Sequence, residues 1–124
     1  MTLEVLEPEF TVCKVADASA IPLSLPYCFV GKTDSELSLV CPTDHTPEDT
    51  LSREDGWRGF RVAGSMDFGL VGVLSRLTGC LAARGIALFA VSTFDTDYVL
   101  VKADKLTEAV AALQADGYAV VWLS

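Results

Sequence analysis

The segment STFDTDY, at residues 92–98, places two carboxylates within three residues and lies between two apolar runs. Short polar segments of this kind are typical of a turn between two strands. The same carboxylates would also suit the ammonium group of a ligand, because a charge-assisted hydrogen bond contributes about 1.5–3 kcal/mol when water is partly excluded. The segment therefore predicts a hairpin. For Asp97 it leaves both turn chemistry and ligand contact open, whereas we interpret Asp95 as a solvated turn residue.

A second candidate segment, GSMDFGLVG at residues 64–72, precedes apolar residues at helical spacing. The start of a helix offers unpaired backbone N–H groups and a partial positive charge, which suit a carboxylate. Gly69 and Gly72 would let a ligand approach the backbone, and tight helix–strand packing explains them equally well. Asp67 is either the cap of a helix that begins at Phe68 or a ligand contact.

Catalytic and metal chemistry have weaker candidates. Cys41, Asp44 and His45 lie close in sequence, and a thiol nucleophile needs a nearby base. Their spacing fits no nucleophile motif, and a solvated histidine in a polar loop explains His45. The chain has one histidine and four cysteines without a CxxC pair, at Cys13, Cys28, Cys41 and Cys80. We therefore expect no zinc site, no cofactor and no enzymatic activity.

The composition limits the partners. The chain has 124 residues, a net charge of −8 and 51% hydrophobic residues. The negative charge argues against nucleic acid and anionic membranes, and no apolar run approaches the roughly 20 residues of a membrane helix. The acidic N-terminus lacks the basic region of a secretory signal, and the apolar surroundings of the cysteines indicate a reduced, cytoplasmic protein. The apolar surplus is either well covered in the fold or taken up by an oligomer interface.

The second half of the chain predicts the element order that positions both candidate segments. Alternating apolar residues indicate strands, and apolar spacings of three and four indicate helices that stop at Gly85 and Gly117. Asp104 would cap the second helix. In order we expect a strand at 57–63, a helix from 68, a strand at 86–91, a strand at 98–102, a helix from 104 and a strand at 118–123. The order βαββαβ is the ferredoxin-like arrangement, an α+β fold with one antiparallel sheet and two helices on one face.

The strand at 86–91 is nearly all apolar, which fits a central strand covered on both faces or a strand at an interface. The first half is less regular. We expect strands at 10–15, 27–32 and 36–41, a short helical turn within 21–26 and a polar loop at 43–56. This half resembles an abbreviated copy of the second. The sequence therefore predicts tandem ferredoxin-like units, an abbreviated one at residues 1–56 and a complete one at 57–124.

Residues 64–102 resemble the ACT-domain family, specifically the tandem ACT-like subgroup related to the CASTOR-type cytosolic arginine sensors. The strand–loop–helix motif at 67–74 and the pattern Ser92-Thr93-Phe94-x-x-Asp97 carry this resemblance. It implies a small regulatory protein that binds an amino acid at an interface between ACT-like units. The ligand-facing positions that it implies are Met66, Asp67, Phe68, Gly69, Leu70, Val71, Gly72, Thr93, Phe94 and Asp97.

The resemblance also implies an assembly. The animal sensors carry four ACT-like units per chain, whereas this chain has room for two, so a comparable assembly would be a homodimer. The specificity for arginine does not follow, because the side-chain pocket is the least matched part. The alternative hypothesis is a ligand-free dimerising interaction module whose sheets pair edge to edge, with Trp122 at the seam.

Overall fold

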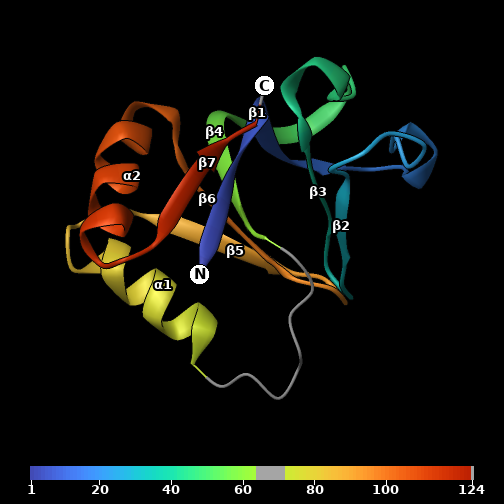
Figure 1. Ribbon diagram of the computed structural model, residues 1–124. Helices are drawn as coiled ribbons and strands as arrows, with labels where there is room; N and C mark the ends of the chain where they lie inside the picture. The colour runs from blue at the N-terminus through green and yellow to red at the C-terminus, as the bar shows by residue number, and fades with distance from the viewer. Residues whose placement is uncertain (64–71, 124) are drawn as a thin grey trace. The chain divides into compact units, whose positions relative to one another are not determined.

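The computed structural model describes residues 1–63 and 72–123 (Figure 1). The chain forms two compact units. Unit 1 consists of Met1–Glu7 and Arg58–Ser124, and unit 2 is the intervening Pro8–Trp57. In sequence, therefore, unit 2 is inserted into unit 1. The first seven residues, which the sequence analysis places in the N-terminal half, belong to unit 1.

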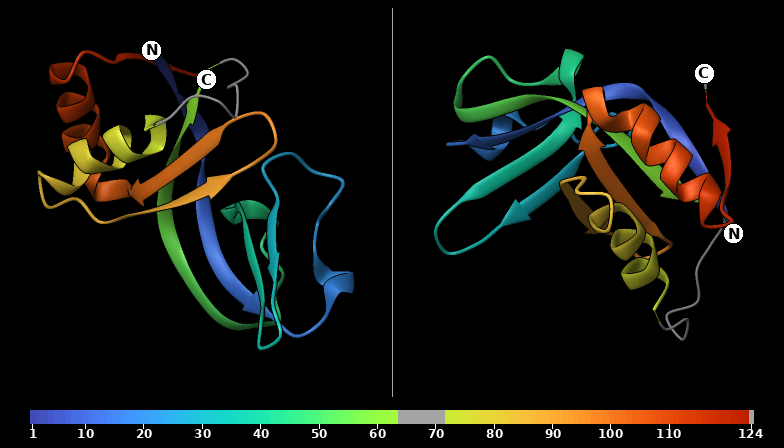
Figure 2. Two further views of the ribbon diagram at one scale, coloured as in Figure 1. Left: turned by 90° about the horizontal axis from the view of Figure 1, so that it is seen from below. Right: turned by 90° about the vertical axis from the view of Figure 1, so that its left-hand side faces the viewer.

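Unit 1 contains the predicted α+β arrangement of strands and two helices. Its elements are the start of β1 (Thr2–Val15), the end of β4 (Thr50–Val62), α1 (Val73–Ala82), β5 (Leu88–Ser92), β6 (Asp97–Lys102), α2 (Leu106–Ala115) and β7 (Ala119–Trp122). From β4 onward, their order confirms the βαββαβ prediction. Both helices lie on one face of the unit 1 sheet, as Figures 1 and 2 show.

The sheet of unit 1 has the strand order β7-β1-β4-β6-β5. Strands β5 and β6 form an antiparallel hairpin in which Leu88 lies opposite Val101 and Ser92 opposite Asp97. The sequence did not predict the start of β1, which lies between β7 and β4 and pairs in parallel with β7. The N-terminal residues thus add a fifth strand to the sheet.

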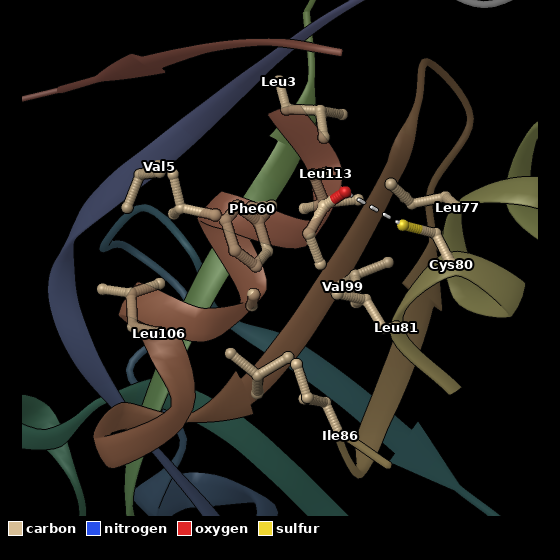
Figure 3. Close-up of a cluster of buried hydrophobic side chains, with 14 of the residues drawn as sticks. Leu3, Val5, Phe60, Leu77, Cys80, Leu81, Ile86, Val99, Leu106 and Leu113 are labelled. Carbon is tan, nitrogen blue, oxygen red and sulfur yellow. Dashed lines mark hydrogen bonds between the residues drawn. The ribbon is translucent and has the colours of Figure 1, made fainter. Parts of the chain in front are cut away.

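The core of unit 1 lies between the sheet and its two helices (Figure 3). Alternate residues of each strand point into it, as the period-2 pattern of a strand requires. Phe60 and Leu113 are at most 1% exposed, and the Cys80 thiol donates a hydrogen bond to the Ala112 carbonyl at 3.4 Å. The main contributors are Leu3, Val5, Phe60, Val62, Leu77, Leu81, Val99, Val101, Ala109, Val110 and Leu113. Covering these side chains from water is the dominant favourable contribution to the folding of this unit.

The ends of both helices follow the sequence prediction. Gly85 and Gly117 have φ values of 70° and 97°, in the left-handed region. After α2, the N–H of Tyr118 donates to the Leu113 carbonyl and the N–H of Gly117 donates to the Gln114 carbonyl. These two bonds form the Schellman motif, which satisfies carbonyls left unpaired at a helix end.

Two sequence expectations for unit 1 are wrong. The apolar run 86–91 does not form a central strand, because β5 is the last strand in the sheet order and its side chains are partly exposed. The alternative, a strand at an interface, stays a prediction. Asp104 does not cap α2. It lies within a 3₁₀ turn, Ala103–Lys105, and Lys105 precedes the helix without a capping side-chain bond.

Unit 2 consists of the remainder of β1, a 3₁₀ turn at Ala18–Ala20, β2 (Phe29–Lys32), β3 (Leu37–Pro42), a 3₁₀ turn at Thr43–His45 and the start of β4. The hairpin of β2 and β3 confirms the two strands predicted there. A small core cluster contains Cys13, Val15, Leu39 and Cys41, with Ile21, Cys28 and Leu37 packed against it.

The short turn expected within 21–26 is a hydrogen-bonded turn in which the Leu25 N–H donates to the Pro22 carbonyl at 3.1 Å. A 3₁₀ turn lies before it, at Ala18–Ala20, and the Asp17 carboxylate caps that turn by accepting a hydrogen bond from the Ser19 N–H. One expectation for unit 2 is wrong. Residues 43–56 are not simply a polar loop, because β4 begins at Thr50. Most side chains in this first part of β4 are exposed, so it lacks the apolar alternation by which a strand is predicted from sequence.

Candidate functional site

The carboxylate of Asp97 lies at the start of β6, where it is 9% exposed. Ser92 is its register partner in the hairpin, and the Ser92 hydroxyl donates a hydrogen bond to Asp97 Oδ1 at 2.6 Å. This is one of the local bonds that the turn interpretation of Asp97 anticipated. An ionised carboxylate has about four acceptor positions. The bond to Ser92 therefore orients Asp97 and still leaves acceptor capacity for a ligand.

Two threonines fix the turn between β5 and β6. Thr93 closes it through its N–H and its hydroxyl, which both donate to the Thr96 carbonyl, at 2.9 and 3.0 Å. Thr96 is buried, at 6% exposure, and its hydroxyl donates to the Val62 carbonyl at 2.9 Å. The hairpin is therefore held against the last residue of β4, the strand that leads in sequence to the predicted ligand loop.

Phe94 projects from the same turn with 81% of its surface exposed, and the neighbouring Asp95 is also exposed. An exposed aromatic ring at a turn is unusual, since turns ordinarily carry solvated polar residues. An exposed ring in this place suits either the wall of a ligand pocket or a contact in an interface.

Gly72 lies directly before α1, with φ 80° and ψ 5°. The expected helix through Gly72 is therefore wrong, because α1 begins at Val73. Among the described residues, nothing lies within 4 Å of where a Cβ of Gly72 would be, so tight packing against them is not the reason for this glycine. The reason is the left-handed backbone, which glycine adopts without steric cost. The other six predicted loop positions, Met66, Asp67, Phe68, Gly69, Leu70 and Val71, lie outside the described residues.

Backbone hydrogen bonds continue from the hairpin across the sheet at this end of unit 1. Ala63, next to Val62, donates its N–H to the Thr2 carbonyl at 2.9 Å. Ala119 donates to the Met1 carbonyl at 3.1 Å. Figure 2 shows the N-terminus, the end of β4 and the first turn of α1 toward this same end. We call it the loop end of unit 1, defined by Met1, Val62, Gly72, Thr96 and Ala119.

A pocket of about 330 Å³ opens beside the first turn of α1. Arg76, Asp116 and Tyr118 provide a cation, a carboxylate and a phenol. Burial raises the pKa of Tyr118, and the charge of Arg76 acts in the opposite direction. The lining residues are Met1, Val73, Arg76, Asp116, Gly117 and Tyr118. Sequence reasoning missed this pocket. The only local signal was the position of Arg76, one turn after Gly72.

The residues considered for catalysis do not form an activated thiol. Cys41 is fully buried, and its Sγ lies 3.6 Å from the Thr46 hydroxyl, whereas His45 is exposed. Burial raises the pKa of Cys41, which is the opposite of what a thiolate nucleophile needs. Within residues 1–63 and 72–123, no cluster of three potential metal-ligating side chains occurs, and no helix is long and apolar enough to cross a membrane.

Comparison with known proteins gives one family and one kind of curated relative. The sequence model of the ACT domain matches residues 52–115. The human and Pongo abelii proteins named cytosolic arginine sensor for mTORC1 subunit 1 are each 28% identical to it, over 82% of this chain and 33% of the relative. The chain thus spans about a third of the length of the curated relatives it matches.

Two solved structures show similarity in fold. A protein from Agrobacterium tumefaciens has a TM-score of 0.88 and 27% identity, covering 99% of this chain and 93% of its own. The ligand-free regulatory subunit of aspartate kinase from Thermus thermophilus has a TM-score of 0.66, with 93% of this chain and 96% of that chain covered. Its identity is 9%, so the second likeness concerns the fold alone.

Proposed function

Since this chain belongs to the ACT-domain family, whose members are regulatory, we propose that it is a regulatory module that binds an amino acid at the loop end of unit 1. The family match and the relation to a named arginine sensor support a small-molecule ligand. Regulation would arise from a difference in ligand affinity between two states of the module, because a ligand shifts an equilibrium only through such a difference.

One observation carries the proposal most directly. The 2.9 Å bond from the Thr96 hydroxyl to the Val62 carbonyl holds the hairpin beside the strand that precedes residues 64–71. This bond supports a shared site, because Val62 ends β4 and the predicted ligand loop follows it in the sequence. Asp97, oriented by Ser92, is the acidic group at this end that we assign to the ligand's ammonium.

The remaining roles follow from the chemistry of an amino acid. The first turn of α1 has backbone N–H groups without a partner inside the helix, and these would receive the carboxylate; the left-handed Gly72 directly before the helix would shape that approach. The hydroxyl of Thr93 and the exposed ring of Phe94 would flank the ligand. Met66, Asp67, Phe68, Gly69, Leu70 and Val71 complete the proposed contact set, on the basis of family resemblance.

The assembly and the location are further parts of the proposal. We propose a homodimer in which a second copy of the chain covers the open side of the ligand. The reason is that the Phe94 ring is 81% exposed, so within one chain it would shield only a small part of a ligand from water. We also propose that the protein acts in the cytoplasm, because the related arginine sensor is a cytosolic protein by name. For this chain the ligand class is an amino acid, and its side chain is left to experiment.

Thermal unfolding with each of the twenty amino acids tests the proposal. A ligand at 100 times its dissociation constant should stabilise the protein by about 2.7 kcal/mol. Asp97→Asn should remove the ligand-dependent shift, because a neutral amide no longer pairs an ammonium. Asp95→Asn is the matched control, two residues away and exposed, and should retain the shift. If Asp97→Asn keeps the full shift, Asp97 is not the ammonium partner.

A ligand-free dimerising module is the second candidate, and the edge strand β7 favours it. Val121 and Trp122 on this strand are 47% and 54% exposed, and in the described part of the chain β7 pairs only with β1. Edge strands with exposed apolar residues tend to pair with another chain. No response to any amino acid, together with a dimer that Trp122→Lys dissociates, would support this candidate over the first.

A further inference from the structure

Three of the four cysteines gather in the small core of unit 2. Cys13 on β1 and Cys41 on β3 are buried members of this core cluster, and Cys28, just before β2, packs against it. We call these residues the unit 2 thiols. Their side chains pack in this core, and the proposed ligand site does not include them.

The β2–β3 register, extended by one residue beyond β2, sets Cys28 opposite Cys41. In the antiparallel hairpin, Lys32 pairs with Leu37 and Phe29 pairs with Val40. Continuing this register by one residue sets Cys28 across from Cys41, with both side chains on the same face. Cys13 has a different relation to Cys41, because the β1–β3 register pairs Cys41 with Thr11 and Cys13 with Leu39. Cys13 is therefore a diagonal neighbour of Cys41.

This difference decides which pair can form a disulfide. Directly opposite residues in an antiparallel pair have Cα atoms roughly 4.5–5.5 Å apart, within the roughly 4.4–6.8 Å that a disulfide spans. Diagonal neighbours are about 7–8 Å apart, beyond that span. On this register Cys28 and Cys41 fall within the span of a disulfide, whereas Cys13 and Cys41 fall outside it.

The unit 2 thiols also differ in access. Cys13 and Cys41 are 4% and 0% exposed, whereas Cys28 is half-buried and so open to a small oxidant. Burial raises the pKa of all three thiols. Oxidation should therefore be slow at neutral pH and should begin at Cys28.

We propose that Cys28 and Cys41 form a peroxide-sensitive pair that closes a disulfide across the β2–β3 hairpin. The Cys28 thiolate attacks one peroxide oxygen, which breaks the O–O bond and gives a sulfenic acid and water. The Cys41 thiol then attacks that sulfur and displaces a second water. In total, two thiols lose two electrons and two protons, and one hydrogen peroxide becomes two waters.

The disulfide pairing can be measured directly, because each of the four cysteines falls in a different tryptic peptide. Cleavage after Lys14, Lys32 and Arg53 leaves Cys13, Cys28 and Cys41 in the peptides 1–14, 15–32 and 33–53, and Cys80 falls in 77–84. The full chain is treated with hydrogen peroxide while folded, alkylated after unfolding, and analysed by mass spectrometry without reduction. We expect peptides 15–32 and 33–53 to be joined, and Cys13 and Cys80 to be alkylated.

Variants distinguish this pair from the alternatives. In Cys28→Ser, peroxide should produce no more disulfide at Cys41 than is found in the untreated protein. In Cys13→Ser, the amount of disulfide between peptides 15–32 and 33–53 should be unchanged. Oxidation should raise the Tm of the wild type and of Cys13→Ser but not of Cys28→Ser, because the crosslink restricts the unfolded chain. A Cys13–Cys41 product, a disulfide between chains, or only sulfinic acid at Cys28 would overturn the proposal.

Discussion

Replacing Thr96 by valine removes the hydroxyl that joins the hairpin to β4 and retains nearly the same shape. Thr96 is 6% exposed, and its bond to the Val62 carbonyl is 2.9 Å long and buried. Leaving a buried acceptor without this partner costs about 1–3 kcal/mol, because little water can replace the donor. We therefore expect Thr96→Val to lower the free energy of unfolding by that amount.

Thr93→Val is the matched control, because it removes another hydroxyl of the same turn. The Thr93 hydroxyl donates to the Thr96 carbonyl at 3.0 Å, but Thr93 is exposed, so water can replace its bond. We expect a loss of about 0.5–1 kcal/mol, the net contribution of an ordinary hydrogen bond.

Urea unfolding of the two variants and the wild type, compared at equal m values, measures both changes. Amide hydrogen exchange adds a local readout, because the Thr93 N–H bonds to the Thr96 carbonyl and should exchange faster in Thr96→Val. The reasoning is refuted if Thr96→Val costs less than about 0.5 kcal/mol, or if Thr93→Val costs more than Thr96→Val.

Three further predictions concern the core, the start of α1 and the buried thiols. Leu81→Ala should cost about 2–5 kcal/mol in urea unfolding, since Leu81 is fully buried in the unit 1 core; a loss under about 1 kcal/mol would contradict that burial. Gly72→Ala should lower the free energy of unfolding by about 1 kcal/mol, because alanine is strained at a φ of 80°. Gly79→Ala lies within α1, where a Cβ has open space, and should raise the free energy of unfolding by about 0.5–1 kcal/mol. Changes of the same sign in the two variants would contradict the left-handed backbone at Gly72. Burial raises the pKa of the unit 2 thiols above the ordinary 9.0, so folding favours their neutral form. The stability that these neutral thiols contribute is fully present below pH 9 and is lost as the pH rises through their raised pKa values in the folded state. The urea midpoint should therefore fall between about pH 9 and 11, and the fall should be smaller in Cys28→Ser.

Local patterns in the sequence were sufficient for the order of the elements in the second half of the fold. The alternation of Phe60 and Val62 indicated a strand, and Gly85 and Gly117 indicated the helix ends, because each signal depends on residues close in sequence. The start of β1 was missed although Leu3 and Val5 alternate with polar residues, since its partner β7 lies more than a hundred residues away.

The candidate site was predictable only in part, for the same reason. Ser92 and Asp97 could be paired from the hairpin alone. The bond from Thr96 to Val62 joins residues 34 apart, and no local pattern distinguishes Thr96 from an exposed turn threonine. Arg76 and Tyr118 likewise line one pocket from distant parts of the sequence.

The central claim is that the loop end of unit 1 binds an amino acid, and nuclear magnetic resonance tests it most directly. The amide spectrum of the ¹⁵N-labelled chain is recorded with each of the twenty amino acids, and the shifts caused by any that bind are mapped onto the sequence. We predict saturable shifts concentrated in Gly72 and in residues 92–97, absent in Asp97→Asn and retained in Asp95→Asn. Unchanged spectra with all twenty, or shifts confined to unit 2, would contradict the account.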